Sequence, residues 1–131
     1  MERLPGRGKS SHACALLNDN IIVAGGIYSG IRPGGAPYIT RTYIIPLSTG
    51  IVRTGGRLNE PRYSHAMVTL DGLYPKVLAI GGVTVGQEIA ASVEEWNEED
   101  EIWETSKMNL SKARSLFGAI AIPSALVCSK N

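Results

Sequence analysis

A short pattern recurs in this chain at an interval of 53 residues, and it constrains the fold more than any other feature. Ser11-His12-Ala13 returns as Ser64-His65-Ala66, and each copy opens an apolar run. A second run follows and ends in a glycine pair, at Gly25-Gly26 and again at Gly81-Gly82. Self-similarity at a period of about 20 to 50 residues is typical of proteins built from repeated structural units. We therefore expect a chain of repeats.

The apolar runs are short and end at turn signals, which favours strands over helices. They cover 13–17 and 21–24 in the first copy, 66–70 and 77–80 in the second, and 118–122 and 125–128 in a truncated third. Runs rich in small and branched residues and closed by Asn, Asp, Gly or Pro are typical of β-strands. Two more strands are predicted at 92–96 and 102–105, so each unit is expected to hold four antiparallel strands.

Two large aromatic residues mark the outer strands of the second unit. Trp96 and Trp103 lie seven residues apart, and an offset of 52 aligns them with Ile44 and Ile51 of the first unit. We expect the indole rings to pack between neighbouring units, with their N–H groups donating to backbone acceptors.

A four-stranded unit with a glycine pair closing its second strand and two large apolar residues seven apart resembles a kelch repeat, one blade of a β-propeller. The resemblance implies an all-β fold, a partial β-propeller of four-stranded antiparallel blades. It divides the chain into the tail of a preceding blade (1–11), blade one (12–61), blade two (62–113) and the first two strands of a truncated third blade (114–131). Because propellers contain about four to eight blades, it also implies further blades from the same chain or from other copies.

Residues that recur at one position of the repeat are interpreted as structural. They are Gly25, Gly26, Gly81, Gly82, Trp96, Trp103, Arg62 and Arg114. The glycines are expected where the backbone bends or approaches the next blade without room for a Cβ atom. The arginines either tie blades together through charge-assisted hydrogen bonds or bind an acidic ligand bidentately.

No catalytic set and no metal site is indicated. His12 and His65 are equivalent in the repeat, which favours structural hydrogen bonding, and the two cysteines add no spacing of the zinc type. Adjacent Ser and His residues on one strand point to opposite faces, so they form no nucleophile and base. We expect no enzyme, no cofactor and no metal. The alternatives are part of a kelch-type propeller enzyme, sugar-processing or similar to a copper oxidase, and a truncated product without independent function.

The charge pattern bears on partners and location. A net charge of +1 and the lack of a long apolar run argue against nucleic-acid and membrane partners. The stretch from Glu94 to Glu104 holds seven acids and no base, which indicates a solvated loop or edge, or otherwise a docking patch for a basic partner. No signal peptide is visible, so a cytoplasmic location is expected, with Cys14 and Cys128 reduced and buried.

The leading hypothesis is a non-catalytic protein–protein interaction module that binds a protein or peptide through loops on one face. The resemblance also implies a possible role in substrate recognition for a ubiquitin ligase, because kelch domains joined to an adaptor-binding domain often have that role. We expect the partner to contact the connections after the second strands and between blades. The partner-binding residues predicted there are Tyr28, Arg32, Tyr63, Ser64, Gln87 and Ser115.

Overall fold

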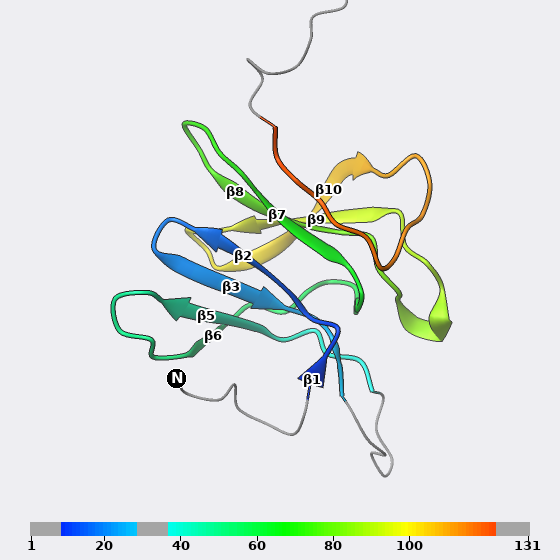
Figure 1. Ribbon diagram of the computed structural model, residues 1–131, viewed down its shortest axis with the longest axis horizontal. Helices are drawn as coiled ribbons and strands as arrows, with labels where there is room; N and C mark the ends of the chain where they lie inside the picture. The colour runs from blue at the N-terminus through cyan, green and yellow to red at the C-terminus, as the bar shows by residue number, and fades with distance from the viewer. Residues whose placement is uncertain (1–8, 29–36, 123–131) are drawn as a thin grey trace, which may run out of the picture.

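The computed structural model describes residues 9–28 and 37–122, and these residues form two four-stranded antiparallel sheets (Figure 1). Sheet one contains β2 (Ala13–Leu17), β3 (Asn20–Ala24), β5 (Thr42–Pro46) and β6 (Arg53–Gly55). Sheet two contains β7 (Ala66–Leu70), β8 (Lys76–Ile80), β9 (Ser92–Asn97) and β10 (Ile102–Asn109). A small extra pair joins β1 (Lys9–Ser10) to β4 (Ile27–Tyr28). The predicted all-β class is confirmed.

Both sheets are meanders, because their strands follow one another in sequence order. The connections therefore alternate between the two ends of the strands. Short turns at 18–19, 47–52, 71–75 and 98–101 make up one end, here called the turn edge. The connections 25–28 with 37–41, 56–65 and 81–91, and the segment 110–122 after β10, make up the opposite end, called the loop edge. Only the start of the connection 56–65 reaches the turn edge of sheet two, where Gly56 N–H donates to Glu101 O at 2.8 Å. Figure 1 has the turn edge on the left and the loop edge on the right.

The hydrophobic core lies between the two sheets, with β2 against β7 and β8. It consists of Leu17, Ile22, Ala24, Ile44, Leu58, Val77, Ala79, Trp96 and Trp103. Every second residue of a strand faces this core, because side chains alternate between the two faces of a sheet. The contact extends to the outer strands, since a Cβ atom on Gly55 of β6 would lie 2.7 Å from the ring of Trp96.

The junction between the sheets is repeated one step further along the chain. At the first junction, Gly26 N–H donates to Arg62 O and Ser64 N–H donates to Ser11 O, both at 2.9 Å. At the second junction, Gly82 N–H donates to Arg114 O at 2.8 Å and Leu116 N–H donates to Ser64 O at 2.9 Å. Ser11, Ser64 and Leu116 also share a left-handed backbone, with φ of 56°, 52° and 54°. Residues 114–116 thus bind sheet two as residues 62–64 bind sheet one.

The strand pairing corrects the sequence alignment of the two units. Ala24 and Ile80 directly precede the glycine pairs, and they pair with Thr42 and Val93, so the third strands are offset by 51 residues and not by 52. One fixed offset fails because insertions in the turns and loops shift each strand separately. The turn between the first two strands, for example, has two residues in sheet one and five in sheet two.

This one-residue difference changes which side chains correspond. Trp96 matches Ile45 and not Ile44, because Ile44 lies on the opposite face of its sheet, in the core. Ile51, the expected counterpart of Trp103, lies outside the strands and is 66% exposed. The predicted correspondence was therefore wrong.

Two further expectations are wrong. Gly118–Ile122 forms no strand, and the run 125–128 that would pair with it lies outside the described residues. Cys14 is exposed, because it pairs with Val23 on the face of sheet one that is turned away from sheet two. Cys128 lies outside the described residues.

Candidate interaction surface at the loop edge

Small β-bridges organise the loop edge in the same way in both units. Each unit contributes three short segments that pair side by side. They meet at Ser10, Ile27 and Tyr38 in the first unit, and at Tyr63, Val83 and Ile89 in the second. The long connections are therefore held to the ends of the sheets by backbone hydrogen bonds, which gives the surface a defined shape.

Tyr38 joins the connections of the two units. Its ring stacks on that of Tyr63, with centroids 6.2 Å apart and an angle of 26° between the planes. Its Oη accepts a hydrogen bond from the Gly86 N–H at 3.3 Å. Gly86 belongs to the 3₁₀ turn Val85–Gln87, where its φ is +73°. The stack contributes about 0.5–1.5 kcal/mol. Through this stack and the hydrogen bond to Gly86, Tyr38 joins its own connection to 56–65 and 81–91, and the three form one surface.

The structure brings most of the nominated residues to this edge. Tyr28, Tyr63, Ser64 and Ser115 are half-buried, Gln87 is exposed, and Arg32 lies outside the described residues. Ser115 lies beside Ser64, because Leu116 N–H donates to Ser64 O. Tyr38 was not among the binding residues nominated from the sequence. The signal that could have identified it is an aromatic residue at the end of the same connection as Tyr28.

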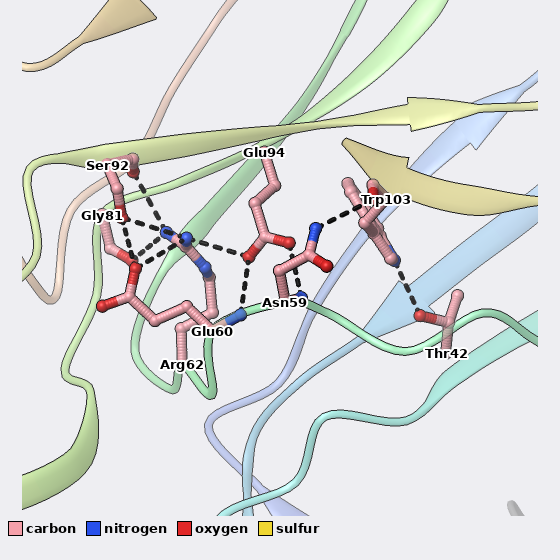
Figure 2. A network of polar contacts seen from close by, with 8 residues as sticks. All are labelled: Thr42, Asn59, Glu60, Arg62, Gly81, Ser92, Glu94 and Trp103. Atoms are coloured by element: carbon pink, nitrogen blue, oxygen red, sulfur yellow. Dashed lines mark hydrogen bonds and ion pairs between the residues drawn. The ribbon is translucent and has the colours of Figure 1, made fainter. Parts of the chain in front are cut away.

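Arg62 lies beneath the loop edge, fully buried, and its side chain binds within sheet two (Figure 2). Nη1 donates to Gly81 O at 2.9 Å and to Ser92 O at 3.0 Å. Nη2 donates to Ser92 Oγ at 3.1 Å and to Glu94 Oε2 at 3.0 Å. Because its own carbonyl also accepts from Gly26, Arg62 links the two sheets.

Glu94 extends this network toward the core (Figure 2). Its Oε1 accepts the Asn59 N–H at 2.7 Å, and Asn59 Nδ2 donates to Trp103 O at 2.8 Å. Trp103 Nε1 then donates to Thr42 Oγ1 of sheet one at 2.8 Å. The indole N–H therefore finds a side-chain hydroxyl, where the sequence analysis expected a backbone acceptor. The network occupies the two terminal nitrogens of Arg62, which leaves them no free hydrogen-bonding direction toward a ligand.

The acidic run from Glu94 to Glu104 does not form one solvated stretch. Glu94 is 2% exposed and belongs to the network, and Glu95 pairs with Lys76 at 2.7 Å. At the turn edge, Glu98 accepts two hydrogen bonds from Asn18 Nδ2 at 2.9 and 3.1 Å. The solvated-loop interpretation therefore holds for the turn and is wrong for Glu94, because its side chain points into the core.

The His65 side chain packs against one glycine of each pair, Gly25 in the first unit and Gly82 in the second. Cβ atoms on Gly25 and Gly82 would lie 2.7 and 2.6 Å from its side chain, and the ring of Phe117 approaches Gly81 in the same way. Burial first, and then the charge of Arg62, lower the pKa of His65 from 6.5 to about 3. A backbone contact with Ala24 opposes this shift of the pKa, although neither ring nitrogen makes a hydrogen bond of standard geometry with a described residue.

A comparison of the chain with protein-family models finds no match, and a comparison with curated proteins finds none either. Within residues 9–28 and 37–122, no three His, Cys, Asp or Glu side chains are grouped so that they could hold a metal ion. The same residues include no helix with the length and apolar character that crossing a membrane requires.

Proposed function

We propose that the two sheets are consecutive blades of a kelch-type β-propeller and that the chain is a non-catalytic protein–protein interaction module. The meander order of each sheet supports this, as does the glycine pair after each second strand. The repeated junction supports it further, because neighbouring blades of a propeller contact one another in the same way at every step. Residues 114–116 make the same backbone hydrogen bonds to sheet two that residues 62–64 make to sheet one.

A propeller of this kind needs more blades than two. The outward face of sheet one exposes Leu16, at 51%, and Cys14. In the proposed ring another blade covers this face, supplied by the same chain or by other copies. Ring closure covers the faces of the end blades and leaves only short, protected strand edges.

The partner, a protein or peptide, is proposed to bind the loop edge. The observation that carries this proposal is the stack of Tyr38 on Tyr63, which joins connections from two units into one aromatic surface. Tyrosine is among the residues that dominate binding energy at protein interfaces, and loops on a rigid scaffold commonly carry recognition. A narrower role in substrate recognition for a ubiquitin ligase requires an adaptor-binding domain joined to the propeller.

Site-specific photo-crosslinking in cells tests the binding edge. A benzophenone amino acid replaces Ile89 at the loop edge, and a matched variant carries it at Ile51 on the turn edge; both side chains are exposed, at 53% and 66%. We expect a discrete crosslinked protein from position 89 only. Crosslinking from position 51 alone, or equally from both, would contradict the proposal.

Alanine substitution then tests the nominated residues against the crosslinked partner. Tyr63→Ala and Arg32→Ala are each expected to weaken binding by about 1–4 kcal/mol, as interface hot spots do. Both variants should fold. Tyr63→Ala also removes the stack on Tyr38, so its free energy of unfolding should fall by about 0.5–1.5 kcal/mol. Ile51→Ala should leave the affinity unaltered. Normal affinity in both loop variants would show that the partner binds elsewhere.

A further inference from the structure

Charged side chains are divided between the two edges of the molecule. In the described residues, the turns of the turn edge carry Asp19, Asp71, Glu98, Glu99, Asp100 and Glu101 and no base. The connections of the loop edge carry the bases Arg41, Arg57, Arg62, Lys112 and Arg114 against the acids Glu60 and Glu88. Arg53 and Lys76, the first residues of β6 and β8, border the turn edge, and Arg53 pairs with Glu101. The turns themselves remain acidic in sum, and the loop-edge connections are basic in sum.

Two of the loop-edge cations are available to a partner. Arg41 and Lys112 are exposed and make no ion pair with a described residue. Arg57 donates to the Thr40 hydroxyl at 3.1 Å and follows Gly56, whose N–H donates to Glu101 O of the acidic turn. Arg62 is buried, and Arg114 would be enclosed by the next blade of the proposed propeller. Glu60 is held by the Arg62 and Ser92 side chains, at 3.5 and 2.7 Å. An exposed acid remains only at Glu88 in the described part of this edge.

The same edge also exposes apolar surface. Val85 and Ile89 are 57% and 53% exposed and come from the connection that Tyr38 contacts through Gly86. Beside them lies the stacked pair of Tyr38 and Tyr63. A ligand for this surface therefore meets aliphatic and aromatic groups flanked by cations.

We propose that the loop edge recognises an acidic peptide segment that carries an apolar or aromatic anchor side chain. This inference rests on the proposed interaction function and adds the chemistry of the partner. Separated charges steer a ligand of complementary sign, so the acidic turn edge repels such a segment while the loop edge attracts it. A nucleic acid is the less suitable anion, because two available cations neutralise few phosphates.

The test uses fluorescein-labelled peptides of alternating glutamate and phenylalanine, with lysine–phenylalanine and serine–phenylalanine versions and a single-stranded oligonucleotide. Binding to the protein is followed by fluorescence anisotropy at low and high salt. We expect the acidic peptide to bind about tenfold or more tighter than the other probes and to lose most of that advantage at high salt, since salt screens exposed charges.

Two neutralising variants locate the attraction. Arg41→Gln and Lys112→Gln should each weaken binding of the acidic peptide by about threefold to tenfold. Ser48→Asp changes the net charge by the same amount on the turn edge, where Ser48 is exposed, and should leave binding unchanged. Because both loop-edge residues are exposed, circular dichroism and the melting temperature should match the parent protein.

Equal binding of the acidic and serine peptides, tighter binding of the oligonucleotide, or an effect of Ser48→Asp as large as that of the loop-edge variants would overturn this inference. The interaction function has its own readout in the Ile89 crosslink and the Tyr63→Ala affinity. If those persist while the acidic peptide shows no preference, the loop edge binds a partner of different chemistry. If the crosslink is also absent, the interaction function fails as well.

Discussion

Arg62 Nη2 lies 3.0 Å from Glu94 Oε2, and the two side chains are 0% and 2% exposed. Arg62 precedes the first strand of sheet two, and Glu94 lies on its third strand. The pair therefore fastens the connection between the sheets to the middle of sheet two. Since the Arg62 carbonyl accepts from Gly26, one residue couples the internal structure of a unit to its contact with the preceding unit.

Glu94→Gln should destabilise the protein strongly. The substitution leaves the buried Arg62 guanidinium with only the partly exposed Glu60, 3.5 Å away, as a counter-charge. Removal of one partner from a buried pair costs about 3–5 kcal/mol. Urea unfolding of the purified protein measures the change. Glu99→Gln, in the exposed turn of the same acidic run, is the matched control and should shift the unfolding free energy by less than about 0.5 kcal/mol. Equal effects would show that the buried pair is not formed.

Replacements of Trp103 separate packing from hydrogen bonding. Trp103→Ala removes a core side chain and should cost about 3–5 kcal/mol. Trp103→Phe keeps much of the ring but leaves the buried Thr42 hydroxyl without its donor, which should cost about 1–3 kcal/mol. Denaturant titration followed by circular dichroism measures both. An alanine effect below about 1 kcal/mol would place the indole in solvent and reopen a role in ligand stacking.

Acid should destabilise the fold through His65. Its pKa is lowered to about 3 in the folded state, so between pH 6.5 and 3 the unfolded chain binds a proton that the folded chain does not. Stability therefore falls as the pH falls through this window, by up to about 1.4 kcal/mol per pH unit from this residue.

His65→Phe tests this linkage, because Phe117 fills the equivalent position beside Gly81. We expect the variant to fold and to lose the His65 contribution to the pH dependence, measured by urea unfolding from pH 7 to pH 4. His12→Phe, at the equivalent position of the first unit where His12 is exposed, should retain the slope. An unchanged slope in His65→Phe would argue against a buried neutral imidazole.

Two glycine substitutions distinguish a close approach from an unfavourable backbone angle. Gly25 and Gly50 have similar φ, +73° and +67°, but only Gly25 is crowded: a Cβ atom there would lie 2.5 Å from Arg62 O, whereas none lies within 4 Å at Gly50. Gly50→Ala should cost about 1–2 kcal/mol, the price of a left-handed alanine. Gly25→Ala should cost more than about 3 kcal/mol, because it also separates the sheets. Similar melting temperatures for both variants would contradict the tight junction.

The chain of 131 residues should not remain a stable monomer, so the unfolding and binding measurements above apply to its assembled form. Leu16 and Cys14 are exposed on the outward face of sheet one, and the strand edges of both sheets are open. Sedimentation velocity at several concentrations should reveal assembly or aggregation. A monomer of 14.0 kDa with a cooperative thermal transition would refute the need for neighbouring blades.

Strand positions were largely predictable because local patterns determine them. The inner strands Ala13–Leu17 and Ala66–Leu70 have the predicted bounds, since both are apolar runs closed by turn residues. The correspondence of Trp96 was missed because loops of different length move each strand by its own amount. A slip of one residue reverses the face on which a side chain lies, so Ile44 and Ile45 could be told apart only after the strands were paired.

The sequence alone determined the all-β class, the four-strand period and the glycine positions, because each follows from short-range alternation and turn chemistry. Tertiary structure decided which acid of the run is buried, since Glu94 lies on β9 on the face turned toward sheet one and Glu98 lies in the turn that follows. It also decided the contact of Tyr38 with Tyr63, residues 25 positions apart whose rings meet where two sheets stack. Burial and convergence depend on contacts between distant segments, and no local pattern encodes those contacts.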